Sequence, residues 1–124
     1  MVLKRLPPEI RIRERYIVFS IMPKERFSLE DVVKTIWSSL LQLFGEAGTS
    51  QFHVWIPSNL YNDKQGIGII RCSHDHVQDV RAALALVKKI EDTPVLIRTL
   101  GVTGTIKAAK EKFLEKKTLE DFSK

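Results

Sequence analysis

The chain has 124 residues, a length that allows one domain with a modest core and leaves too little for two. Hydrophobic residues make up 44% of it, which excludes a chain disordered throughout, and no apolar run approaches the roughly 20 residues that span a bilayer. The formal charge is +5 and lies at the ends, because residues 1–15 carry +3, residues 107–124 carry +2 and residues 16–106 are neutral. We expect a soluble, cytoplasmic protein whose basic ends either contact a phosphate backbone or only maintain solubility.

The N-terminal segment combines proline with arginine. Pro7 and Pro8 suit the first turn of a helix, so residues 1–14 form either a short helix or an extended basic arm. Residues 15–22 (RYIVFSIM) then predict a strand, because they are rich in β-branched and aromatic side chains and are followed by Pro23.

A helix with clear start and stop signals follows. Ser28 is suited to cap it, and Asp31 stands at the acidic position of a capping box. Phe27 and Val32 have the spacing of a hydrophobic staple, and Gly45 predicts the C-terminal end. Apolar side chains recur at helical spacing between these ends: Val33, Ile36, Trp37, Leu40, Leu41 and Phe44.

Two further strands are predicted around a turn-rich connection. Residues 51–56 (QFHVWI) and 66–72 (GIGIIRC) have strand composition, and the short segment between them favours a hairpin. Gly66 and Gly68 belong to the second strand, where glycine is more typical of a bulge or of close packing than of a phosphate-binding loop.

A second long helix is predicted over residues 76–90. Ser73 or Asp75 is expected to cap it, and Pro94 to prevent its continuation. Its apolar side chains are Val77, Val80, Leu84, Val87 and Ile90.

The last elements are a strand, a turn and a lysine-rich helix. Residues 95–100 (VLIRTL) predict the strand, residues 101–104 the turn, and Thr105 the start of the helix. The helix has a narrow apolar face made of Ile106, Ala109, Phe113 and Leu114. Residues 119–124 are expected to fray.

The order strand, helix, strand, strand, helix, strand is typical of an α+β fold, the ferredoxin-like (RRM-like) βαββαβ sandwich. We expect an antiparallel four-stranded sheet, an extra C-terminal helix and a basic N-terminal arm, with residues 15–118 forming the single domain. The strands carry apolar side chains on both faces, so both faces need cover. A protein partner, a second copy of the chain or the last helix folding back would each supply it.

No constellation of side chains predicts an enzyme or a metal centre. Cys72 is a single thiol, more typical of a small buried side chain than of a nucleophile. His74 and His76 stand two apart, where they point apart, and structural zinc normally takes four ligands. Asp75 and Asp79 lie four apart and favour a solvated helix face over an acid–base pair. We expect no catalytic residues and no metal ligands.

Residues 98–109 (RTLGVTGTIKAA) carry the strongest functional signal. Gly101 and Gly104 permit unusual backbone angles, and Thr103 offers a hydroxyl. The free N–H groups at the start of the next helix favour an anion, and Lys107 stands in its first turn against the helix dipole. From the residues alone, an anion site and a tight loop with a threonine cap remain equally open.

Three stretches of the chain resemble the archaeal ribonuclease P protein component 2 family, which is related to the eukaryotic Pop-five subunit of ribonucleases P and MRP. LPPEIRIRERYIVFSI resembles the family's N-terminal L-P-P-x-x-R…R-Y-I stretch. GIGIIRCSHDHVQDVRAALALVKKI resembles its G-x-x-R-x-x-x-x-x-x-x-x-x-R-x-A-L segment. RTLGVTGTIKAAKEKFL resembles its closing R-T-x-G-x-S/T-G-T-I-K motif, which is fairly specific.

The resemblance implies a ferredoxin-like protein subunit of the ribonucleoprotein that removes the 5′ leader of precursor tRNA. In that particle the RNA holds the active site and uses magnesium, so the protein is expected to bind no cofactor of its own. The implied partners are ribonuclease P RNA, precursor tRNA indirectly, and a TIM-barrel subunit, component 3. A homodimer around that pair is a further implication, and no membrane is implied.

RNA contacts are expected on loops, helix ends and basic termini. RNA-recognition motif domains share this strand order but stack bases on aromatic side chains of the middle strands, and residues 66–72 offer none. The candidate contacts are Lys4, Arg5, Arg11, Arg13, Arg15, Arg98, Thr103, Gly104, Thr105, Lys107 and Lys110. Arg71 and Arg81 are alternatively structural ion-pair partners. The competing hypothesis is a protein-interaction module whose basic ends bind acidic partners.

Overall fold

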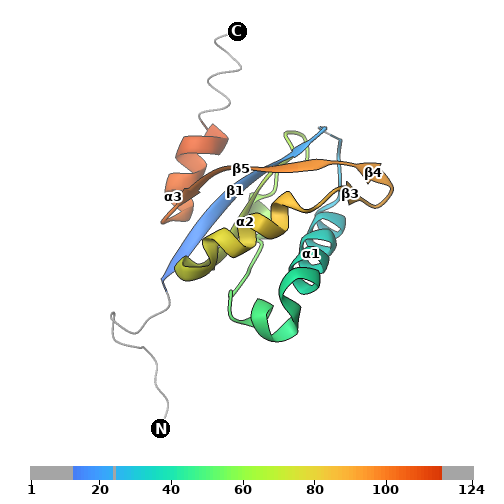
Figure 1. Cartoon of the computed structure of the whole chain (residues 1–124). Coiled ribbons are helices and arrows are strands. Elements are labelled where there is room, and N and C mark those ends of the chain that lie inside the picture. Colours follow the sequence, from blue (N-terminus) through green and yellow to red (C-terminus); the bar gives the residue numbers. More distant parts are fainter. Residues whose placement is uncertain (1–12, 24, 116–124) are drawn as a thin grey trace.

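The computed structural model describes residues 13–23 and 25–115, and Figure 1 shows a sheet with α1 and α2 on one side and α3 on the other. Predictions for the arm up to residue 12 and for residues 116–124 lie outside the described residues. The elements are β1 (Glu14–Met22), α1 (Leu29–Ser50), β2 (Ile67–Ser73), α2 (Val77–Ala85), β3 (Lys89–Ile90), β4 (Thr93–Pro94), β5 (Leu96–Thr103) and α3 (Ile106–Ala109), with 3₁₀ turns η2 (Ser58–Leu60) and η3 (His74–His76) and a π turn η4 (Lys110–Glu115).

The main sheet has three antiparallel strands in the order β2-β1-β5. β1 is central, so Ile17 lies opposite Ile70 on one side and Val102 on the other. The register with β5 shifts between Val18 and Phe19, which leaves Leu100 as the additional residue of a bulge. The predicted first strand is confirmed, and it ends at the predicted proline through a cis Met22–Pro23 bond.

The predicted strand over residues 51–56 is wrong as a strand. Only Trp55 forms an isolated antiparallel bridge, exchanging both backbone hydrogen bonds with Arg71 of β2. His53 has a positive φ of 53°, which an extended ladder does not accommodate, so the pairing is interrupted. The four-stranded sheet is therefore not confirmed within the described residues, where the main sheet has three strands and two isolated bridges to β2, Trp55–Arg71 and Asn62–Ile67.

The first helix begins as predicted. The backbone N–H of Asp31 donates to Oγ of Ser28 at 3.2 Å, which satisfies one of the free N–H groups of the first turn. Phe27 and Val32 are both buried in the same apolar cluster. At Gly45 the backbone kinks (φ 70°, ψ 177°), and helical structure resumes up to Ser50, so the glycine interrupts α1 instead of ending it.

The second helix is shorter than the predicted 76–90. It ends at Ala85, and the chain turns into the two-residue strands β3 and β4, with Pro94 in β4. Val87 and Ile90 are still buried in the core, but Val87 reaches it from the turn after the helix and Ile90 from β3. Residues 87 and 90 are three positions apart, a spacing that fits one face of a helix but does not require a helix. Periodicity alone therefore placed the C-terminal end of the second helix too late in the chain.

The predicted turn at residues 101–104 is also corrected. β5 continues through Gly101 to Thr103, paired with β1, so the turn is confined to Gly104 and Thr105. Neither Gly101 nor Gly104 has a positive φ; the described glycines that do are Gly45 and Gly66. The start of the last helix at Thr105 is confirmed.

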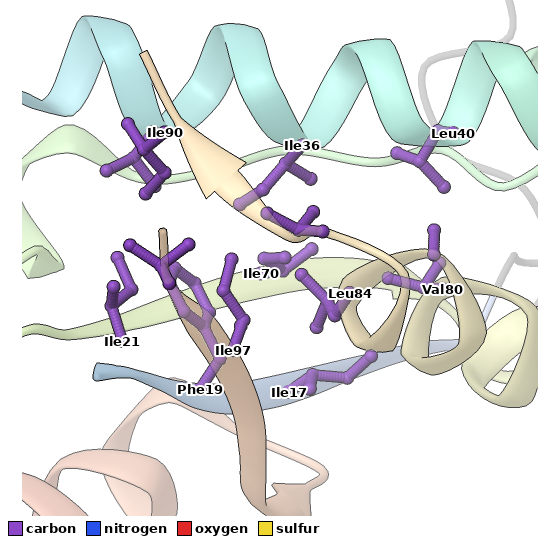
Figure 2. Close-up of a cluster of buried hydrophobic side chains, with 14 of the residues drawn as sticks. Ile17, Phe19, Ile21, Ile36, Leu40, Ile70, Val80, Leu84, Ile90 and Ile97 are labelled. Carbon is purple, nitrogen blue, oxygen red and sulfur yellow. The ribbon is translucent and has the colours of Figure 1, made fainter. Parts of the chain in front are cut away.

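The main core lies between the sheet and the pair α1 and α2. Figure 2 shows side chains from all of these elements pointing into this space, the labelled ones being Ile17, Phe19, Ile21, Ile36, Leu40, Ile70, Val80, Leu84, Ile90 and Ile97. Each is at most 3% exposed, and complete burial of such a side chain contributes about 1.5–3 kcal/mol. This cluster holds both helices on one face of the sheet.

The opposite face of the sheet is covered by α3. A second buried cluster there comprises Val18, Leu60, Ile67, Ile69 and Ala109, with Tyr16, Leu100 and Ile106 packed against it. Of the three alternatives for this face, the last helix folding back is thus confirmed. No helix of the described part of the chain combines the length and apolarity needed to cross a membrane.

Candidate RNA interface

The turn that leads into α3 uses its threonine hydroxyls internally. Thr103 is buried, and its Oγ1 donates to the carbonyl oxygen of Thr105 at 2.9 Å. Oγ1 of Thr105 accepts from the backbone N–H of Ala108 at 3.1 Å, as an N-cap does. The threonine-capped tight loop is therefore present, and the donor of Thr103 is used inside it. An anion at this position would meet backbone N–H groups of the turn, the exposed Lys107 and the hydroxyl of Thr105, which only accepts within the turn.

The candidate RNA contacts fall on separate parts of the molecule. Arg13 and Lys107 are exposed, and Arg15 is half-buried with its guanidinium donating to the carbonyl of Glu14 at 2.9 Å. Lys110 is exposed beside the loop over residues 59–65. The candidates Lys4, Arg5 and Arg11 lie outside the described residues.

Arg71 is held by its neighbours on the sheet, so the ion-pair alternative is confirmed for it. Its Nε lies 2.6 Å from Oε2 of Glu14, and its guanidinium carbon lies 4.5 Å from the centroid of the Trp55 ring. Both charged side chains are about one-third exposed, so the pair orders this sheet edge more than it stabilises the fold.

Arg81 has different surroundings. It is exposed on α2 and forms no ion pair with any residue of the described ranges. It lines a concavity of about 420 Å³ together with Arg98 of β5. The sequence contained no signal for this pairing, because 17 positions separate the two residues and only the packing of α2 against β5 brings them to one groove.

The residues considered for catalysis lie in structural roles. Cys72 is fully buried, and burial raises the pKa of its thiol to about 11, so it stays protonated at neutral pH. His76 Nδ1 lies 3.0 Å from Asp79 Oδ2, and His74 Nε2 lies 3.0 Å from Asp75 Oδ1. Across residues 13–23 and 25–115, no three histidine, cysteine or acidic side chains gather in a way that could hold a metal ion.

Comparison with known proteins gives consistent matches along nearly the whole chain. The model of the Rpp14/Pop5 family matches residues 15–114. The chain is 41% identical to ribonuclease P protein component 2 of Pyrococcus abyssi over 114 residues, covering 92% of this chain and 95% of that protein. It is 43% identical to the component 2 of Pyrococcus horikoshii over 114 residues (92% and 93%), and 38% identical to that of Methanobrevibacter smithii over 123 residues (94% and 100%).

The fold also has a counterpart among solved structures. A chain in the cryo-EM structure of yeast ribonuclease MRP superimposes with a TM-score of 0.62, covering 91% of this chain and 93% of that one. The two sequences are 12% identical, so this likeness shows a shared fold.

Proposed function

The chain belongs to the Rpp14/Pop5 family, and from this premise we propose that it is a protein subunit of ribonuclease P, which removes the 5′ leader from precursor tRNA. One observation carries the proposal: relatives that bear the name ribonuclease P protein component 2 are about 40% identical to it and align over nearly their whole length. Its role is to bind and support the RNA of a ribonucleoprotein in the cytoplasm.

We place the chemistry of cleavage on the RNA, with magnesium as the cofactor of that RNA. The described side chains supply a buried, protonated Cys72 and two separate histidine–aspartate pairs instead of a convergent acid–base set. Exposed cations at Arg13, Lys107 and Lys110 are suited to phosphate contacts that position an RNA without reading its sequence.

Reconstitution of precursor tRNA cleavage at low magnesium tests this function. With the RNA and the other protein subunits present, adding the chain is expected to raise the cleavage rate, because its cations replace part of the magnesium that screens the RNA. An unrelated basic protein of similar size and charge is the control. Equal cleavage with and without the chain would contradict the proposal.

A protein partner is proposed as well, namely the TIM-barrel component 3, with a homodimer of this chain around it. The support is a set of exposed leucines on the helical side, Leu41 and Leu43 on α1 and Leu86 after α2, which α3 does not cover. Light scattering of the chain alone and mixed with component 3 measures this association. A chain that stays monomeric in both samples would refute it.

We further propose that residues 52–56 take the place of the fourth ferredoxin-like strand beside β2. The supports are the Trp55–Arg71 bridge and the hydrogen bond from the N–H of Ser73 to the carbonyl of Phe52 at 2.8 Å. Hydrogen exchange checks it: the amides of Trp55 and Arg71 should be protected together, and rapid exchange at Trp55 alone would count against it.

Lys107→Glu is predicted to weaken binding to ribonuclease P RNA. The side chain is exposed beside the turn, and reversing its charge turns an attraction for phosphate into repulsion. The slope of log affinity against log salt should become shallower by about 1. Lys34→Glu, the same change at an exposed position on α1, is the control. If Lys107→Glu folds and binds with unchanged affinity and slope, the turn does not contact RNA.

A further inference from the structure

A groove of about 420 Å³ runs between α2 and the edge strand β5, and Figure 1 shows these two elements side by side. Gln78, Arg81, Ala82 and Ala85 of α2 line one side, and Ile97, Arg98 and Thr99 of β5 line the other. Its volume is in the range of small-ligand sites.

The α2 side of the groove follows from helix geometry. Gln78, Arg81, Ala82 and Ala85 recur at positions i, i+3, i+4 and i+7, so they form one exposed stripe. The stripe on the other side of the helix is buried in the core. Because two of the four exposed side chains are alanines, a bulky group can approach the helix closely between Arg81 and β5.

The β5 side of the groove contributes backbone as well as side chains. β5 is the last strand of the described sheet and pairs only with β1 there, so part of its backbone N–H and C=O groups face outward. An edge of this kind offers N–H donors to an acceptor-rich group, in addition to the side chains of Arg98 and Thr99.

The charge of the groove has one sign. Both arginines are exposed, none of the lining residues is acidic, and neither Arg81 nor Arg98 is ion-paired within the described ranges. A guanidinium presents parallel N–H donors that match the oxygens of a phosphate. Two of them beside the amide of Gln78 and the hydroxyl of Thr99 fit an anion with several acceptor oxygens.

Two other concavities differ in this respect. The one between α1 and the end of α2, about 540 Å³, has lysines but also Glu91 and the exposed Leu43 and Leu86. The one beside Lys110 includes Asp63. Mixed charge and exposed leucines suit protein contacts better than phosphate, so the groove between α2 and β5 is the better candidate for a nucleic-acid backbone.

We infer that this groove binds backbone phosphates of an RNA, with Arg81 and Arg98 as the contacting cations. The inference rests on the proposed function and deepens it, because it adds Arg81 and assigns a defined surface to RNA. The contacts are to the backbone, so they set the position of the RNA and discriminate little between sequences.

The test uses the double variant Arg81→Gln/Arg98→Gln. Its affinity for ribonuclease P RNA is measured at several salt concentrations and compared with that of the wild-type chain. Affinity near 0.15 M salt is expected to fall about tenfold, and the slope of log affinity against log salt to become shallower by about 2, one for each phosphate contact. Lys34→Gln/Lys88→Gln removes the same charge from exposed positions outside the groove and is expected to lose much less affinity. Arg81→Lys/Arg98→Lys should keep the salt slope and lose only part of the affinity.

The outcomes separate this inference from the proposed function. If the wild-type chain binds the RNA but the glutamine pair binds equally well, or the control pair loses as much, the groove is not the contact and the function stands. If the wild-type chain does not bind the RNA, both fail. Thermal unfolding of each variant monitors the fold, and the lysine pair tests the groove should the glutamine pair unfold.

Discussion

Gly68→Ala is expected to lower the free energy of unfolding by about 2–3 kcal/mol, because the added methyl group has no room. A Cβ at this position would lie 2.6 Å from Cζ of Phe19 and 3.2 Å from Cδ1 of Tyr61. The Phe19 ring is fully buried in the main core, so it cannot move aside without disturbing its other contacts. Urea unfolding followed by tryptophan fluorescence measures the change in stability.

Gly104→Ala is the matched control for this prediction. No atom lies within 4 Å of a Cβ built there, and the backbone has no positive φ, so the stability should change by less than about 0.5 kcal/mol. If Gly68→Ala and the wild type have the same unfolding midpoint, the sheet accommodates the methyl group. The Phe19 ring then does not pack closely against Gly68.

Ala109→Glu is expected to detach α3 from the sheet. Ala109 is fully buried against Val18 and Ile69, and a carboxylate placed there would lose its hydration without a partner, at a cost of about 3 kcal/mol or more. Release of α3 would expose the apolar side chains beneath it. We therefore expect faster hydrogen exchange in α3 together with self-association.

Hydrogen exchange and light scattering at several concentrations measure both effects. Ala47→Glu places the same side chain at an exposed position of α1 and should leave the protein monomeric and α3 protected. If Ala109→Glu is as stable and as monomeric as the control, α3 does not cover this face. The separate cluster between the sheet and α1 and α2 should keep the rest of the domain folded.

Several local features were predictable from sequence because their causes lie within a few residues. Ser28 caps α1 through a hydrogen bond to Asp31, and Thr105 caps α3 through one to Ala108. β1 is a strand because β-branched and aromatic residues precede a proline. The resemblance to component 2 proteins, carried by short motifs, is confirmed by the match to the Rpp14/Pop5 family.

Other features required the tertiary structure because they depend on residues far apart in the chain. Residues 51–56 have strand composition, yet the conformation of His53 limits their pairing to one bridge. Val87 and Ile90 have helical spacing, but Val87 enters the core from the turn after α2 and Ile90 from β3. Strand ladders and helix ends of this kind are decided by which partner buries each side chain, and composition does not contain that information.

The candidate RNA surface likewise has some features that the sequence determined and others that only the tertiary structure decided. By itself, the sequence determined that basic residues concentrate at the ends, that a threonine-capped turn precedes the last helix, and to which family the chain is related. Only the tertiary structure decided that α3 covers the second face of the sheet, that Arg71 is ion-paired, and that Arg81 and Arg98 line one groove. The physical reason is range: capping and charge content act along the chain, whereas burial and convergent charge depend on which distant elements pack together.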